Sequence, residues 1–196
     1  LFNDNLFVAN SGGYTYDNTI SVINTLNKSI IKTITVGANP KSMVLDKNQK
    51  LWVLCSGSEI YDANWNTIGH HASKLLRINP FDFSIEKEIQ LFASNHPAKL
   101  AVNGSGDLLY FGSGFGFTGI YTLNINSISF TENLLINKAF YGFDFNKNTN
   151  EIFAFEAPNY TERGKLYRYT ADGVELGNYT VGIAPNGSSL KRIIKL

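Results

Sequence analysis

The residues of this chain that offer chemistry beyond packing include its three histidines. His70 and His71 are adjacent, and His96 stands directly before Pro97. Adjacent histidines on an extended segment point to opposite sides, so His70 and His71 cannot chelate one metal as a pair. No Cys or carboxylate cluster accompanies them at ligand spacing. We therefore predict no metal site, and we expect these histidines to contact a ligand or to make structural hydrogen bonds.

Aromatic rings gather in four segments rich in Gly, Ser and Asn, at residues 11–18, 56–73, 112–119 and 156–163. A loop that only joins two strands does not need Trp or Phe, whereas recognition surfaces use large rigid rings because these bury area at little entropic cost. The alternative is that the rings fold inward and plug one end of the fold. Together with the histidines and one arginine, the predicted ligand-binding residues are Tyr14, Tyr16, Tyr61, Trp65, His70, His71, His96, Phe115, Phe117, Tyr160 and Arg163.

The residue types needed for covalent or phosphate chemistry are not arranged as catalytic motifs. The chain has no Gly-x-Ser-x-Gly motif, and no helix is expected after the glycine-rich run at residues 112–117, which excludes a phosphate-binding loop. Asp62, Glu156 and Glu162 supply carboxylates to the same segments, where solvation at a rim is the default. We predict that the protein is not an enzyme and that it uses no cofactor.

A repeated unit of four strand-length apolar runs positions these segments. One complete copy occupies residues 45–103, and its first run has equivalents beginning at Leu6, Leu109 and Ile152. A period of roughly 40–50 residues with four strands in each copy is typical of a β-propeller. The sequence therefore predicts an all-β protein, a β-propeller of four-stranded antiparallel blades. The expected blades cover approximately residues 5–36, 41–91, 98–136 and 141–181.

The two ends of the repeat are offset. The first copy enters at its second strand, and residues 188–195 provide an innermost strand with no blade behind it. Either residues 188–195 complete the first blade of a closed four-bladed ring, or the chain is the C-terminal part of a larger ring. The chain begins at Leu1 without an initiator Met, which favours a piece of a longer precursor and the larger ring.

The meander predicts which links share a face. Alternate links of a radial meander lie on opposite faces, so the four aromatic segments are expected on one face, together with the links that precede the innermost strands at residues 37–40, 92–97, 137–140 and 182–185. Function tends to lie on loops held by a rigid scaffold, so this face is the expected binding surface.

Composition limits the class of partner. Lys+Arg 17 against Asp+Glu 16 gives a net charge of +1 with no basic block, so we expect no nucleic-acid partner. No apolar stretch approaches 18 residues, so no transmembrane segment is expected in this chain. Cys55 is the single cysteine, which excludes an internal disulfide, and its position in an apolar run predicts a buried thiol.

Several segments in order carry a family resemblance. Residues 20–24 (Ile-Ser-Val-Ile-Asn) followed by residues 32–37 (Lys-Thr-Ile-Thr-Val-Gly) and Pro40 resemble the YVTN-type propeller repeat. The order of the segments at residues 43–55, 96–111, 140–154 and 163–187 is similar to that of the surface propeller lipoproteins of Bacteroidetes. This resemblance implies a seven-bladed ring, a location on the cell outer membrane with a lipid anchor, binding of cobalamin or a related corrinoid, and a TonB-dependent outer-membrane transporter as partner.

The matched residues lie mostly at strand and turn positions, and fewer of them lie in the loops that would contact a ligand. Residues 56–73 are long and idiosyncratic, and residues 186–190 depart from the glycines and aromatics that relatives tend to show. We expect a surface propeller that captures a nutrient, first cobalamin or a related corrinoid, and delivers it to the transporter. The alternatives are a protein–protein interaction module without a small ligand, and a propeller enzyme of the lyase, lactonase or dehydrogenase type.

Overall fold

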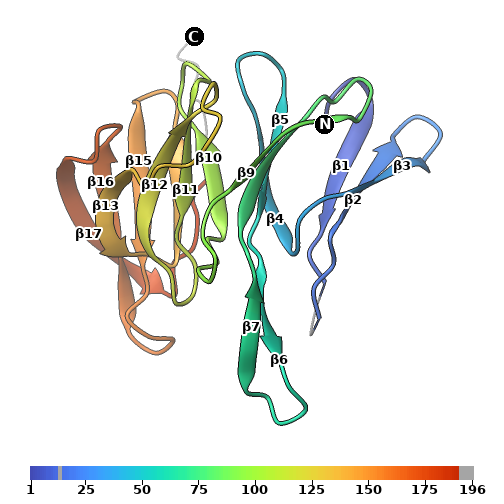
Figure 1. Ribbon diagram of the computed structural model, residues 1–196. Coiled ribbons are helices and arrows are strands. Elements are labelled where there is room, and N and C mark those ends of the chain that lie inside the picture. The colour runs from blue at the N-terminus through green and yellow to red at the C-terminus, as the bar shows by residue number, and fades with distance from the viewer. Residues whose placement is uncertain (13–14, 190–196) are drawn as a thin grey trace.

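The computed structural model describes residues 1–12 and 15–189, which form strands, turns and loops without a helix. Every strand pair is antiparallel. Four large sheets stand side by side across the molecule, and a two-stranded hairpin projects from one end (Figure 1). No helix able to cross a bilayer occurs in the described part of the chain.

Each large sheet contains strands that follow one another up and down. The first sheet contains β1 (Asn5–Asn10), β2 (Thr19–Asn24) and β3 (Ser29–Thr35). The second contains β4 (Pro40–Leu45), β5 (Leu51–Cys55), β8 (Lys74–Ile78) and β9 (Ile85–Gln90). The third contains β10 (Lys99–Val102), β11 (Leu108–Gly112), β12 (Thr118–Asn124) and β13 (Leu134–Ala139). The fourth contains β14 (Gly142–Asn146), β15 (Glu151–Glu156), β16 (Arg163–Thr170) and β17 (Glu175–Ile183).

The second sheet is apolar on both faces, as the side chains of β5 illustrate. Leu51, Val53 and Cys55 belong to the core cluster shared with the first sheet, whereas Trp52 and Leu54 belong to the cluster shared with the third. Successive side chains of a strand alternate between faces, so an unbroken apolar run buries both of them. The sheets therefore pack face to face in series.

Three core clusters result, one between each pair of neighbouring sheets. In the middle cluster, the Phe92 ring contacts the rings of Phe111 and Phe117, and all three rings contact Tyr121. Cys55 is buried as predicted, and burial raises the pKa of its thiol to about 12. This serial face-to-face packing of antiparallel meanders confirms the predicted all-β propeller fold.

Three details differ from the sequence-based expectations or lie beyond them. Residues 56–73, expected as an irregular loop, contain the hairpin of β6 (Ser58–Tyr61) and β7 (Thr67–His71). The sequence pattern places the ends of the last two blades at residues 136 and 181, but strands β13 and β17 continue past them. The residues around Phe130 form a loop instead of a strand, and the Phe130 ring packs on Phe92. The proposed closing strand at residues 188–195 lies mostly outside the described residues, and the seven-bladed ring stays a prediction.

Candidate functional site

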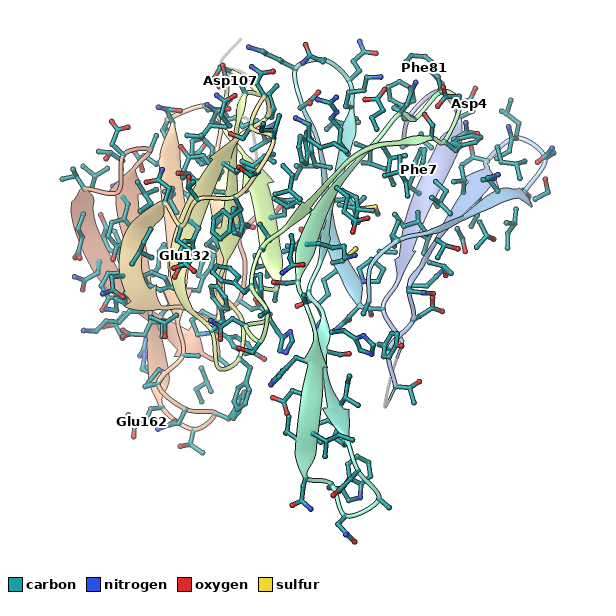
Figure 2. All side chains as sticks on the ribbon, viewed as in Figure 1. Asp4, Phe7, Phe81, Asp107, Glu132 and Glu162 are labelled. Carbon is teal, nitrogen blue, oxygen red and sulfur yellow. The ribbon has the colours of Figure 1, made fainter. Side chains whose placement is uncertain are left out.

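The described residues of the four aromatic segments lie toward the end of the molecule from which the hairpin projects, which we call the hairpin face. Figure 2 places Glu162 of the fourth segment at this end, whereas Asp4, Phe81 and Asp107 lie at the opposite end. Segments from the first three sheets enclose a cavity of about 750 Å³ on this face, which we call the hairpin-face pocket. Its volume is in the range of small-molecule sites. Its lining includes Ser11, Gly12, Thr15, Tyr16, Asn39, Lys41, residues 56–63, Trp65, His71, His96, Ala98 and Phe115.

The hairpin forms one wall of this pocket, and Asp62 shapes its tip. The Asp62 Oδ1 atom accepts hydrogen bonds from the backbone N–H groups of Asn64 (2.8 Å) and Asn66 (2.9 Å), as Asp does in tight turns. Trp65 adopts a left-handed backbone with φ of 65°, which is uncommon for a bulky residue. Trp65 is 74% exposed, and its ring centroid lies 6.0 Å from that of Tyr61. The turn therefore holds two large rings in solvent.

Tyr16 and His71 join the hairpin to the first sheet. Their ring centroids are 4.5 Å apart at an angle of 58°, so the loop before β2 contacts the inner end of β7. Tyr16 is 44% exposed in this contact. The pocket therefore has two aromatic walls on different sheets, and neither Tyr16 nor His71 belongs to a core cluster.

His70 and His96 meet on another side of the hairpin. The His70 Nδ1 atom lies 3.1 Å from His96 Nε2, and His96 Nδ1 lies 2.8 Å from the Ser56 carbonyl oxygen. Adjacent histidines thus diverge as the strand period predicts: His71 contacts Tyr16, and His70 contacts a histidine 26 residues away. His96 therefore makes a structural hydrogen bond and lines the pocket at the same time.

Charges of both signs surround the pocket. Lys41 and Asp62 line it together with Glu59. The Glu59 Oε2 atom accepts a hydrogen bond of 2.9 Å from the Thr67 hydroxyl. Hydrogen bonding from Tyr61, and then from Thr67, lowers the pKa of the Glu59 carboxyl, so this group is anionic at neutral pH. The pocket can therefore pair neutral polar, cationic and anionic groups with an amphipathic ligand.

Phe115 and Phe117 share one loop but differ completely in environment. Phe115 is 84% exposed and lines the pocket, whereas Phe117 is 5% exposed and packs 5.5 Å from Phe92 in the middle core. The expectation that Phe117 contacts a ligand is therefore wrong, and the inward-folding alternative describes this ring. Gly114 makes the arrangement possible, because a Cβ atom there would lie 2.8 Å from the Cβ of Ala98.

Tyr160 and Arg163 do not line the pocket. Tyr160 is exposed and lies 6.1 Å from the Tyr141 ring, and the Arg163 Nε–H donates to the Val181 carbonyl at 3.0 Å. Tyr160 lies in the loop between β15 and β16 and Arg163 begins β16, and the fourth sheet contributes no residue to the pocket lining. Tyr14 lies outside the described residues. The structure thus unites Tyr16, Tyr61, Trp65, His71, His96 and Phe115, with His70 beside them.

Sequence reasoning missed the polar part of the lining. Asn39 and Lys41 come from the link before β4 and the start of that strand, and Ser56 and Gly57 form the link between β5 and β6. The meander already places the 37–40 link on this face, so position along the repeat was the available signal. Residue type was uninformative, because Asn, Ser and Lys are common on any surface.

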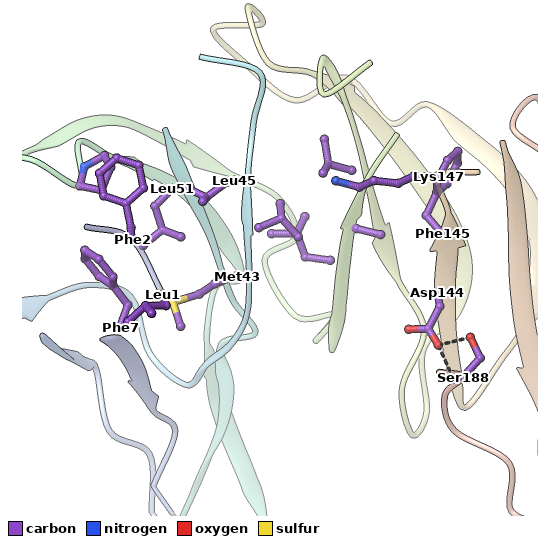
Figure 3. Close-up of a pocket in the computed structure, with 15 residues that line it drawn as sticks. Leu1, Phe2, Phe7, Met43, Leu45, Leu51, Asp144, Phe145, Lys147 and Ser188 are labelled. Carbon is purple, nitrogen blue, oxygen red and sulfur yellow. Dashed lines mark hydrogen bonds between the residues drawn. The ribbon is translucent and has the colours of Figure 1, made fainter. Parts of the chain in front are cut away.

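A second cavity lies among the innermost strands, and we call it the inner hollow. Its volume is about 610 Å³, and Figure 3 shows Phe2, Phe7, Met43, Leu45 and Leu51 on one side of it. On the other side lie Asp144, Phe145, Lys147 and Ser188, with the Ser188 hydroxyl donating 2.9 Å to Asp144 Oδ2. Strand side chains, instead of loops, make most of its walls.

Comparison with known proteins supports the fold and assigns no family. No protein-family model matches the chain, and no curated protein matches it. Among solved structures, the chain is similar to Kuenenia stuttgartiensis hydrazine synthase (TM-score 0.68, 12% identity, 91% of this chain and 46% of that one). It is also similar to a quinoprotein alcohol dehydrogenase-like protein from Bacteroides thetaiotaomicron (TM-score 0.64, 14% identity, 93% and 45%). A gluconolactonase from Xanthomonas campestris gives a TM-score of 0.62 at 12% identity, with 93% and 61% covered.

These likenesses correct one prediction. The expectation that the protein is not an enzyme is contradicted, because hydrazine synthase and gluconolactonase are enzymes built on the same arrangement of sheets. At 12–14% identity the likeness shows the fold alone and assigns no reaction. The chain spans about half the length of the first two of these proteins and 61% of the third.

Proposed function

We propose that the protein captures a small amphipathic ligand in the hairpin-face pocket. The observation that carries this proposal is a cavity of about 750 Å³ walled by Tyr16, Tyr61, Trp65 and Phe115, none of which belongs to a core cluster. Rings that do not stabilise the core and that face a cavity are suited to bury a ligand. Core packing does not explain why these rings face the cavity, whereas contact with a ligand does.

The pocket is held in shape before a ligand arrives. Asp62 fixes the hairpin tip, and the Ser56 hydroxyl donates 2.6 Å to the Pro97 carbonyl, which ties β5 to the segment before β10. A pre-formed site loses little conformational entropy on binding, so a larger share of the contact energy appears as affinity.

Cobalamin or a related corrinoid is the ligand we propose first. A corrinoid has a broad apolar macrocycle edged with amide groups, which suits aromatic walls beside neutral polar groups such as Asn39 and Ser58. The sequence resemblance to Bacteroidetes surface propellers points to the same ligand. On that resemblance we also propose a location on the surface of the outer membrane and delivery to a TonB-dependent transporter.

Calorimetric titration of the purified chain with cyanocobalamin tests the ligand. We expect saturable heat at one equivalent and retention of the coloured ligand on a gel-filtration column. A flat titration with both cyanocobalamin and cobinamide overturns the corrinoid assignment. If the same rings then prove to bind a partner protein, the interaction-module alternative replaces ligand capture.

A propeller enzyme acting at the same pocket is the second candidate. It is favoured by the convergence of His71, His96 and Glu59 on one cavity, since histidine and carboxylate side chains serve as general acids and bases. Gluconolactone hydrolysis is a suitable first assay, given the lactonase among the structural matches. Turnover that disappears in His96→Gln would support this candidate, and turnover that persists there would place any activity elsewhere.

A further inference from the structure

The pair formed by His70 and His96 has the dimensions of a metal-binding pair. Their facing nitrogens, His70 Nδ1 and His96 Nε2, are 3.1 Å apart, and the ring centroids are 5.3 Å apart. Two nitrogens bound at 2.0–2.1 Å to one tetrahedral zinc ion are about 3.3 Å apart. Only a few tenths of an ångström separate the observed pair from that spacing.

The backbone prepares His96 for this role. Its Nδ1 atom is 2.8 Å from the Ser56 carbonyl oxygen, which can only accept, so Nδ1 carries the proton and Nε2 presents a lone pair. A histidine whose second nitrogen donates to a carbonyl is the usual arrangement of a metal ligand, because that bond fixes the tautomer and the ring orientation. Gly57 keeps this approach open, since a Cβ atom there would lie 3.0 Å from His96 Nδ1.

We propose that His70 and His96 bind a first-row transition-metal cation of the Zn²⁺, Ni²⁺ or Cu²⁺ type through His70 Nδ1 and His96 Nε2. Imidazole nitrogen suits these ions. Without metal, the His70 Nδ1–H donates to His96 Nε2. On binding, that proton leaves Nδ1 and His70 takes the tautomer protonated at Nε2, so two neutral rings face one cation.

The surroundings make this an open site with two protein ligands. The described residues contain no group of three or more His, Cys, Asp and Glu side chains placed to hold a metal. Glu59 lies directly opposite His70 in the hairpin register and adds a negative charge beside the cation. Water or a ligand in the adjoining hairpin-face pocket would complete the coordination, since His96 lines that pocket. The site does not require the corrinoid assignment.

Zinc titration of the tag-free, corrinoid-free chain tests the site, followed by nitrogen NMR of the histidine rings. The chain has only three histidines, so each ring can be assigned. We expect Zn²⁺ to shift the ring signals of His70 and His96 and to leave His71 unchanged. His70→Gln should weaken zinc binding at least about tenfold, since loss of a group that only hydrogen-bonds to a metal ligand already lowers metal affinity by that factor.

His71→Gln is the matched control, because the neighbouring ring points to Tyr16 and away from the pair. Zinc affinity in this variant should stay within about twofold of the unaltered chain. His70 is exposed, so His70→Gln should fold, and circular dichroism and thermal melting verify this. Absence of shifts at millimolar zinc, unchanged affinity in His70→Gln, or equal loss in His71→Gln would each overturn the proposal.

Discussion

The two cavities of this molecule have similar volumes but different walls. Around the inner hollow, Leu51 belongs to the core between the first two sheets and Met43 packs against it, Val102 belongs to the middle core, and Phe145 packs on the third core. In the hairpin-face pocket, the rings of Tyr16 and Trp65 belong to none of the three cores. Packing of the cores therefore explains the apolar lining of the inner hollow, but it does not explain the rings that line the hairpin-face pocket.

Cavity volume alone therefore does not identify a binding site. The inner hollow forms where the three cores approach one another at β4, β10 and β14, so its buried apolar side chains, such as Leu51 and Val102, also stabilise the fold. The hairpin-face pocket is built from links that the sheets would tolerate in shorter form. Substitutions should therefore separate the two regions into one that controls stability and one that controls binding.

The largest expected contrast lies within a single loop. Phe117→Ala should lower the free energy of unfolding by about 3–5 kcal/mol, because it empties a buried aromatic site beside Phe92. Phe115→Ala should change it by less than about 0.5 kcal/mol, since that ring is 84% exposed. Urea unfolding followed by circular dichroism measures both. Similar losses in the two variants would break the distinction between core and pocket rings.

A smaller loss of stability is expected at the wall of the inner hollow. Leu51→Ala should cost about 2–3 kcal/mol, since Leu51 is buried in the core between the first two sheets but already borders a cavity. The same variant should bind ligand at the hairpin face unchanged once it is folded. Urea titration and ligand titration of one preparation measure the two quantities, and weakened binding with intact folding would contradict the division of roles.

The smallest effect concerns the end of the molecule opposite the hairpin face. Hydrogen bonds from Asn103 and Ser105, and then Lys47, lower the pKa of Asp107 from 3.8 to about 2. A lowered folded-state pKa contributes stability above the unfolded pKa that disappears as the pH falls from about 4 to about 2. Asp107→Asn should remove that slope and leave binding at neutral pH unchanged. Unfolding midpoints between pH 5 and pH 2 measure it, and identical slopes would refute the assignment.

Strand periodicity made the scaffold readable from the sequence. The unbroken run at residues 51–55 and the recurring first runs required sheets packed on both faces, and these sheets are present. The burial of the Cys55 thiol was predictable from the same pattern. The hairpin at residues 58–71 could not be anticipated, because β6 is only four residues long and mostly exposed, and its pairing depends on the turn that Asp62 fixes.

The site was predictable in outline and not in its contacts. Ring-rich links on one face could be inferred from the meander, which brought Tyr16, Trp65 and Phe115 together. Burial of Phe117 depends on Gly114, which lets the loop approach Ala98, and the periodicity of apolar residues does not predict such a contact. The pairing of His70 with His96 joins residues 26 positions apart, so no local spacing reveals it.

Binding at the hairpin-face pocket is tested most directly by measuring the affinity for cyanocobalamin of three proteins: the unaltered chain, Leu51→Ala and the double variant Tyr16→Ala/Trp65→Ala. We expect equal affinity in the first two and a loss of at least about tenfold, or 1.4 kcal/mol, in the double variant. Unchanged binding in the folded double variant, or binding lost in Leu51→Ala instead, would contradict the claim that the hairpin-face pocket receives the ligand.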